Sequence, residues 1–158
     1  MCTLVSQGLS KDFGAAGVRV GCVYTENEEV LGAVRVQTRF MTTSSNTLFS
    51  IAGAFGNMDA MRAFVVENQA HLGGKANKVK KILRDEQIPF LDTPAGLFIY
   101  LDLSEMLDEL SWEAELRLTK DLIDAGVFMT PGKECCNEHP GHYRCCFASV
   151  DDATLVSS

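Results

Sequence analysis

Three residues near the start of the chain carry groups that together suit a phosphate-bearing aldehyde. Ser10 and Lys11 are adjacent in a turn framed by glycines, and Arg19 follows eight residues after Lys11. A lysine amine that is held and partly desolvated can attack a carbonyl and form an imine. A hydroxyl and an arginine fork bind phosphate oxygens. The set therefore fits pyridoxal phosphate, although a Ser-Lys pair is also typical of an ordinary solvated turn.

Neighbouring residues exclude three competing motifs around this lysine. A Ser-x-x-Lys nucleophile needs a serine at position 8, which is Gly8. A phosphate-binding P-loop needs Ser or Thr directly after the lysine, where this chain has Asp12. The glycines of 14–17 have the wrong spacing for a dinucleotide-binding fingerprint.

A second group of reactive side chains lies between residues 135 and 146. It holds four cysteines and two histidines within twelve residues, a composition that invites a zinc site. Adjacent cysteines on a strand point to opposite faces, however, and the usual short gap between paired ligands is absent. We therefore expect no metal here and interpret the cysteines as buried small side chains that flank a loop.

Arg144 is the third candidate, because it falls in the middle of a predicted strand. It lies between Tyr143 and two cysteines, where an unpaired charge is unfavourable. Its natural partner is a carboxylate. The residues alone allow either an internal ion pair with Asp or Glu, or the carboxylate of a bound substrate.

Composition limits the class of protein. The chain has 158 residues and a mass of 17.3 kDa, which fits one domain or one and a part, with 46% hydrophobic and 22% charged residues. This balance argues against wholesale disorder. Lys and Arg number 14 against 21 Asp and Glu, for a net charge of −7. Nucleic acids and anionic membranes repel such a charge, so we expect neither as a partner.

Two further patterns concern the location of the protein. No apolar run reaches the length of a membrane span, and residues 1–11 lack the pattern of a secretory signal. The six cysteines, among them Cys2 and Cys22, are therefore interpreted as reduced thiols. We expect a cytoplasmic location.

Hydrophobic periodicity predicts a mixed α/β chain. Strands are expected at 3–5, 18–24, 97–103, 127–129 and 143–148, and helices after Asn27, after 42–46, over 59–88 and over 112–125. Gly73-Gly74 is expected to break or weaken the long helix. Its basic residues, Lys75, Lys78, Lys80, Lys81 and Arg84, are interpreted as a solvated face. The unpaired opening strand and an undeveloped helical turn at 151–156 suggest a fragment of a larger protein.

A resemblance links these patterns. The segment 8–21, which reads GLSKDFGAAGVRVG, resembles the lysine motif of fold-type-I pyridoxal-phosphate enzymes. The nearest branch is similar to 1-aminocyclopropane-1-carboxylate synthases and their aminotransferase relatives. The similarity continues through 24–27, Ser44-Ser45, 94–98, 130–132 and 143–148, in matching order and spacing over nearly the whole chain.

This resemblance assigns roles to the candidate residues. It implies that pyridoxal 5'-phosphate is the cofactor, that Lys11 forms the internal aldimine and later moves the α-proton, and that Ser10 and Arg19 hold the phosphate. It implies that Arg144 binds the α-carboxylate of an amino-acid substrate. Transamination and the elimination that forms the cyclopropane ring both begin from the same aldimine. The candidate residues therefore do not indicate which of the two reactions is catalysed.

The resemblance also implies an architecture. We expect a partial fold-type-I transferase of the α/β class, with residues 1–56 forming the C-terminal part of the cofactor-binding large domain. Residues 57–158 would form the small α+β C-terminal domain with its final helix truncated. Because enzymes of this family are dimers that build each site from both chains, a homodimer or a complementing chain is expected.

Departures from the family pattern limit what this chain can do alone. The family usually has serine where this chain has Gly8. The upstream half that supplies an aromatic residue, an asparagine and an aspartate around the cofactor ring is absent from this sequence. Asp12 does not replace that aspartate, because it adjoins the lysine.

We therefore predict a truncated aminotransferase or 1-aminocyclopropane-1-carboxylate synthase-like protein that acts on an amino acid, in a setting such as secondary-metabolite biosynthesis. The alternative is a catalytically inactive remnant or a dimerisation fragment. In either case the chain alone is expected to be catalytically incomplete and to expose apolar surface.

Overall fold

The computed structural model describes residues 3–148. The chain divides into two compact units, Met1–Glu67 and Asn68–Ser158, and the long helix α4 (Met58–Asp85) contributes to both. Because this division falls inside a helix, the domain boundary after residue 56 stays a prediction. Within the described residues, no helix is long and apolar enough to cross a membrane.

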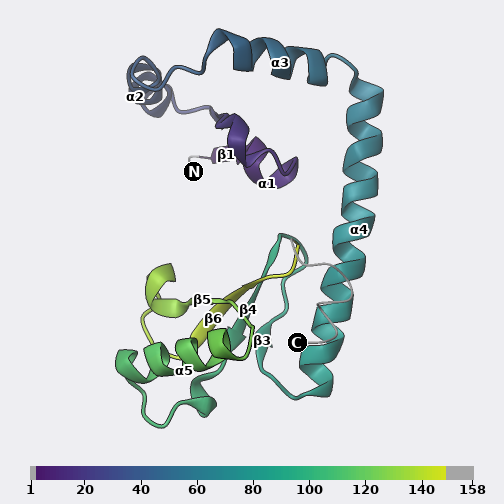
Figure 1. Ribbon diagram of the computed structural model, residues 1–158. Coiled ribbons are helices and arrows are strands. Elements are labelled where there is room, and N and C mark those ends of the chain that lie inside the picture. The colour runs from purple at the N-terminus through teal and green to yellow at the C-terminus, as the bar shows by residue number, and fades with distance from the viewer. Residues whose placement is uncertain (1–2, 149–158) are drawn as a thin grey trace. The chain divides into compact units, whose positions relative to one another are not determined.

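The first unit consists of a hairpin and helices (Figure 1). Its elements are β1 (Leu4–Gly8), α1 (Leu9–Asp12), the 3-10 turn η1 (Ala16–Val18), β2 (Gly21–Thr25), α2 (Glu28–Thr38), α3 (Ser45–Phe55) and the start of α4. Both predicted helix caps are confirmed. The side chain of Asn27 accepts hydrogen bonds from two backbone amides of α2, and that of Ser44 accepts one from α3.

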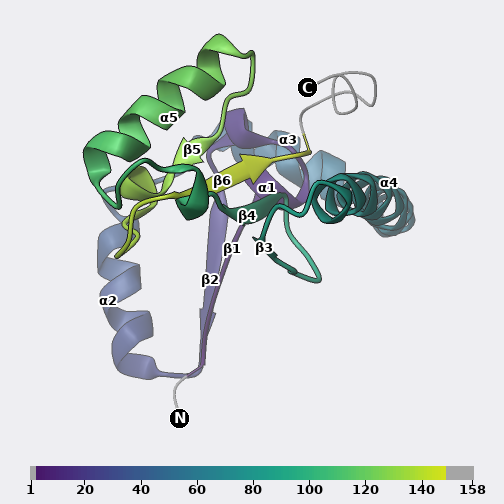
Figure 2. The same cartoon turned by 90° about the horizontal axis from the view of Figure 1, so that it is seen from below.

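The second unit is built on a four-stranded antiparallel sheet in the order β3-β4-β6-β5. Its elements after α4 are β3 (Phe90–Leu91), β4 (Phe98–Asp102), η2 (Ser104–Met106), α5 (Trp112–Asp124), β5 (Thr130–Pro131), η3 (Gly132–Cys135) and β6 (His142–Cys146). Figures 1 and 2 show α5 lying along the sheet. The prediction that 97–103 and 143–148 share one small sheet covered by the helix at 112–125 is therefore confirmed.

The core lies on one face of this sheet. Ile99 and Leu101 of β4 point to the same face as Tyr143 of β6, and all three are buried. They pack with Val79 and Leu83 of α4 in a single cluster. Because successive strand residues alternate between faces, the side chains of the intervening residues are presented on the opposite face, where they are half-buried or exposed.

Gly73-Gly74 were expected to break or weaken the long helix, and the break does not occur, because α4 runs through both glycines. Each glycine lowers helix stability by about 1 kcal/mol. Burial of Val79 and Leu83 further along α4 offsets this cost. A Cβ at either glycine would meet nothing within 4 Å.

The interpretation of the basic residues as a solvated face is wrong for two of them. Lys75 is only 9% exposed, and its amine donates a hydrogen bond to the carbonyl of Ala148. Lys80 donates to the carboxylate of Asp92 at 2.5 Å and to the carbonyl of Thr93 at 2.6 Å. Long lysine stems pack along apolar surface while their amines find oxygen partners.

Two smaller predictions also differ from the structure. The strand expected at 127–129 begins instead at Thr130, because the amide of Val127 is bonded to Leu122 at the end of α5. Cys135 and Cys136 lie in and just after the short helix η3 rather than on a strand. Cys2 and the turn expected at 151–156 lie outside the described residues.

Ile99 offers a test of this core, because its side chain is fully buried. We expect Ile99→Ala to lower the free energy of unfolding by about 2–5 kcal/mol, through lost apolar burial and the cavity left behind. Ile123→Ala is the matched control, since Ile123 is 49% exposed on α5. Urea titration followed by circular dichroism measures both, and equal losses would contradict the placement of the core.

Candidate functional site

The predicted lysine turn begins where the hairpin ends. The pairing of β1 and β2 runs from Leu4 opposite Thr25 to Gly8 opposite Gly21. One further bond follows, from the amide of Leu9 to the carbonyl of Val20 at 3.1 Å. Ser10 and Lys11 continue from one strand, and Arg19 precedes the other. The structure therefore brings these three predicted residues to the same end of the hairpin.

The backbone between Lys11 and Arg19 is a compact turn. The amides of Phe13 and Ala15 both donate to the carbonyl of Leu9, at 3.2 and 3.1 Å. Gly14 has a φ of +62°, a conformation that glycine adopts without strain. Arg19 takes the left-handed region at φ 54°, where side-chain-bearing residues are uncommon. Its guanidinium is anchored by a 3.3 Å hydrogen bond from Nη1 to the carbonyl of Ala16.

The two glycines at the last pair of the hairpin differ in what they permit. A Cβ at Gly21 would come within 2.9 Å of the carbonyl oxygen of Gln7, so glycine is required there. A Cβ at Gly8 would meet only the carbonyl of Val20 at 3.8 Å, which is ordinary contact. The departure from the family serine at Gly8 is therefore not forced by packing.

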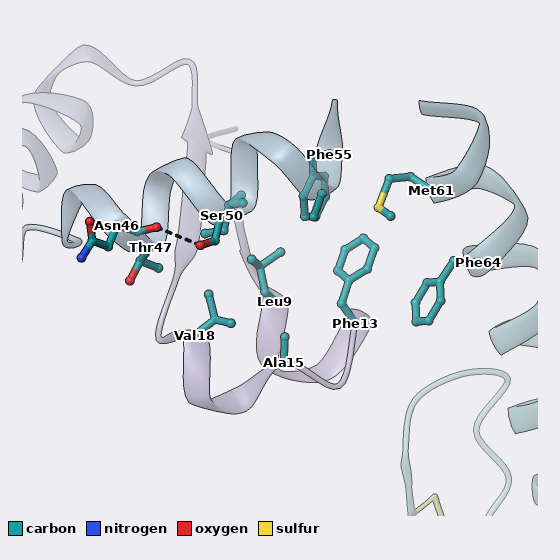
Figure 3. Close-up of a pocket in the computed structure, with 12 residues that line it drawn as sticks. Leu9, Phe13, Ala15, Val18, Asn46, Thr47, Ser50, Phe55, Met61 and Phe64 are labelled. Atoms are coloured by element: carbon teal, nitrogen blue, oxygen red, sulfur yellow. Dashed lines mark hydrogen bonds between the residues drawn. The ribbon is translucent and has the colours of Figure 1, made fainter. Parts of the chain in front are cut away.

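An apolar pocket of about 580 Å³ lies between the lysine helix α1 and the helices α3 and α4 (Figure 3). Leu9 and Phe13 extend into it from either end of α1, one helical turn apart, while Lys11 is exposed. The Phe13 ring packs edge-on against Phe55 at 5.0 Å and stacks on Phe64 at 5.7 Å. Apolar contacts therefore fix the short helix that carries the lysine.

The opposite end of this pocket is polar. Asn46, Thr47 and Ser50 of α3 line it, and the hydroxyl of Ser50 donates to the carbonyl of Asn46 at 3.0 Å. Hydrophobic periodicity predicted the helix α3 but not this pocket. The alignment of Phe13 with two aromatic residues from other helices is a tertiary feature with no local signal.

Arg144 lies in the second unit, on the face of the sheet opposite the core. Its Nη2 donates a 3.3 Å hydrogen bond to the hydroxyl of Thr130, and its guanidinium carbon lies 4.8 Å from the ring centre of Phe98. Among residues 3–148, it forms no ion pair with an acidic side chain. The internal ion pair considered from the sequence is therefore not formed there.

The cysteines do not gather into a metal site within residues 3–148, where no group of three or more potential ligands could hold an ion. Cys136 is exposed, and Cys135, Cys145 and Cys146 are half-buried. Burial raises the pKa of the Cys145 thiol, which keeps it protonated at neutral pH. The interpretation of the four cysteines as buried is thus wrong for Cys136, and the other three are only half-buried.

Sequence reasoning missed two polar residues of the second unit. Thr130 is its hydrogen-bond partner, and Glu115 is a fully buried carboxylate on α5. Glu115 did leave a signal in the sequence, because it stands at helical spacing from Leu118, Thr119 and Leu122 on the inward stripe of α5.

Comparisons with solved structures show the fold to which this chain belongs. The fold matches solved aspartate aminotransferases from Thermus thermophilus, with a TM-score of 0.82 and 24% identity over 98% of this chain and 39% of the double mutant's chain. It also matches a PLP-bound C-S lyase from Staphylococcus hominis, with a TM-score of 0.72, 19% identity and coverage of 98% of this chain and 38% of the other. The chain thus has a partial fold-type-I architecture.

The sequence places the chain within a family. The model described as aminotransferase class I and II matches residues 2–156, so the chain belongs to that family. It is 34% identical to 1-aminocyclopropane-1-carboxylate synthase 1 of Oryza sativa subsp. indica, over 96% of this chain and 31% of that protein. It is equally similar to synthase 11 of Arabidopsis thaliana, covering 33% of it. The chain spans about a third of the length of these relatives.

The close approach at Gly21 yields a test of the hairpin end. We expect Gly21→Ala to destabilise the pairing by about 1–3 kcal/mol, because its Cβ would overlap a backbone carbonyl. Amide exchange at Leu9 should then accelerate. Gly17→Ala is the control, since a Cβ there meets nothing within 4 Å. Unchanged exchange at Leu9 in Gly21→Ala would contradict this packing.

Proposed function

We propose that the chain is part of a pyridoxal-phosphate-dependent enzyme in which Lys11 forms the covalent link to the cofactor. The family to which it belongs is pyridoxal-phosphate-dependent. The observation that carries the proposal is the hairpin end, where a hydroxyl, an amine and a guanidinium come from Ser10, Lys11 and Arg19.

The donor set at this hairpin end fits a phosphorylated aldehyde. The hydroxyl of Ser10 and the guanidinium of Arg19 supply donors for phosphate oxygens. The exposed amine of Lys11 supplies the nucleophile that holds the cofactor and then moves a proton at the substrate α-carbon. When bound, the cofactor supplies an electron sink for that carbon.

The proposed substrate is an amino acid whose carboxylate pairs with Arg144. Support comes from the surroundings of the guanidinium, which is held by Thr130 and Phe98 and forms no ion pair within residues 3–148. An arginine oriented in this way presents a fork that matches a carboxylate. Reaction on the amino group and elimination at the side chain are both compatible with these contacts.

We propose that turnover requires more of the fold than residues 3–148 supply. The relatives are about three times as long, and the side chains expected around the cofactor ring belong to their upstream part by resemblance. A second copy or a complementing chain would provide them. A cytoplasmic role in secondary-metabolite biosynthesis stays a prediction.

The second candidate function, a non-catalytic interaction fragment, is favoured by the apolar character of the first unit. Phe40 and Phe49 are each 83% exposed, and the pocket between α1, α3 and α4 has aromatic walls. The proposed occupant of these surfaces is a chain that carries the remaining part of an aminotransferase fold, since such chains are about three times as long as this one.

Labelling with the cofactor tests the first proposal. Incubation with pyridoxal phosphate should produce imine absorbance, and borohydride should fix the label on Lys11. Lys11→Ala should abolish specific labelling. Arg19→Ala should weaken it about ten- to a hundred-fold, because a charge-assisted hydrogen bond to the phosphate is lost. Arg144→Ala should leave it nearly unchanged, because Arg144 serves the substrate.

The distribution of the label decides between the two candidates. Peptide mapping that finds equal labelling on Lys78, Lys81 and Lys120, with no preference for Lys11, would refute the cofactor site and favour the interaction fragment. All three control lysines are exposed. Turnover of an amino acid by this chain alone at about 1–10³ per second would instead refute its catalytic incompleteness.

The state of association provides a separate prediction. Because large apolar side chains such as Phe40 and Phe49 are exposed, we expect the chain to self-associate with rising concentration. Sedimentation equilibrium measures this directly. A homogeneous monomer throughout the accessible concentration range would argue against both the homodimer and the interaction fragment.

A further inference from the structure

Glu115 is a buried carboxylate that closes a loop. The residue is 1% exposed, on the face of α5 that packs against the sheet. Its Oε1 accepts a 3.1 Å hydrogen bond from the amide of Lys133, and its Oε2 accepts a 2.7 Å bond from the amide of Gly141. These amides lie at the two ends of the segment 133–141. One side chain therefore ties together the residues that follow β5 and precede β6.

Two glycines allow the backbone to approach this carboxylate. Gly141 has a φ of +93°, and a Cβ there would lie 2.6 Å from the Cα of Ser104. A Cβ at Gly132 would lie 2.9 Å from the carbonyl of His142 and 3.4 Å from Glu115 Oε2. Both positions therefore favour glycine, and both oxygens of the carboxylate accept hydrogen bonds from backbone amides.

The element that depends most on this closure is β5. It contains only Thr130 and Pro131 and lies at the edge of the sheet, where it pairs with β6. Such a short edge strand has little stability of its own. The carboxylate of Glu115 holds the chain two residues beyond β5 against the start of β6, which keeps Thr130 opposite Arg144.

We propose that Glu115 is a positioning residue for Arg144 and that it acts through β5 and Thr130. With β5 held, the hydroxyl of Thr130 accepts from Arg144 Nη2 at 3.3 Å, while the Phe98 ring supports the guanidinium at 4.8 Å. The arginine fork is oriented before any ligand arrives, which reduces the entropy lost on binding. The relevance to substrate rests on the proposed function, in which Arg144 binds a carboxylate.

Glu115→Gln tests the pair of hydrogen bonds that Glu115 accepts from Lys133 and Gly141. The amide side chain keeps one acceptor and turns a donor toward the second backbone amide. Glu113→Gln is the matched control, an exposed glutamate in the same turn of α5. NMR should show that amide exchange at Lys133 or Gly141 accelerates about ten- to a hundred-fold in Glu115→Gln. The Phe98→Leu variant removes the aromatic ring and so gives the position of the Arg144 Nε–Hε resonance without its ring current. In Glu115→Gln this resonance should move toward that position. Glu113→Gln should change neither.

Thr130→Val supplies a second test that does not alter the core. It removes the hydroxyl and keeps the shape, so the Arg144 resonance should move as in Glu115→Gln while amide exchange at Lys133 and Gly141 stays unchanged. Thr130→Ser should return the Arg144 resonance to its position in the unaltered protein. An acetate titration followed at Arg144 should show roughly two- to ten-fold weaker binding in Thr130→Val.

The outcomes separate the positioning role from the proposed function. An Arg144 resonance that is unmoved in Thr130→Val, or in folded Glu115→Gln with faster loop exchange, would overturn the inference. If Glu115→Gln does not fold, the Thr130 pair decides alone. If acetate leaves Arg144 of the unaltered protein unperturbed while both variants move its resonance, the positioning role stands and carboxylate binding by Arg144 fails.

Discussion

The second unit depends on the antiparallel register between β4 and β6. Their pairing sets Leu101 opposite Tyr143 in the core and Tyr100 opposite Arg144 on the other face. Because side chains alternate along a strand, a shift of one residue would exchange these two sets. The guanidinium would then enter the core without a partner, and the phenol of Tyr143 would lose its bond to the backbone of Glu115. Core packing and the exposure of Arg144 are thus consequences of one pairing.

The first unit relies on a different arrangement, in which a short helix is fixed by a few aromatic contacts. The four residues of α1 form too few hydrogen bonds to be stable alone. Leu9 and Phe13 anchor them in the pocket, and the bond from Leu9 to Val20 joins them to the hairpin. Lys11 therefore lies on an element whose position is set by tertiary contacts with β2, α3 and α4 rather than by its own hydrogen bonds.

The features that were predicted correctly from the sequence are those that depend on residues close together along the chain. The caps at Asn27 and Ser44 and the apolar strand at 97–103 depend on neighbouring residues, so they could be predicted directly. The continuity of α4 through Gly73-Gly74 could not, because it depends on burial of distant residues against the sheet. The candidate residues were found because motif spacing is local, whereas the roles of Glu115 and Thr130 arise from contacts between elements.

The backbone at Gly8 has a consequence for how sequences of this kind can vary. Its φ of −137° and ψ of 143° are open to every amino acid, and a Cβ would meet no atom closer than 3.8 Å. Serine, the residue expected there from the family resemblance, would therefore enter without rearrangement. The difference between the two is a single hydroxyl next to the lysine turn, with no structural barrier on either side. Position 8 can therefore hold glycine or serine without a change in the hairpin, whereas a Cβ at Gly21 on the facing strand would come within 2.9 Å of the carbonyl oxygen of Gln7.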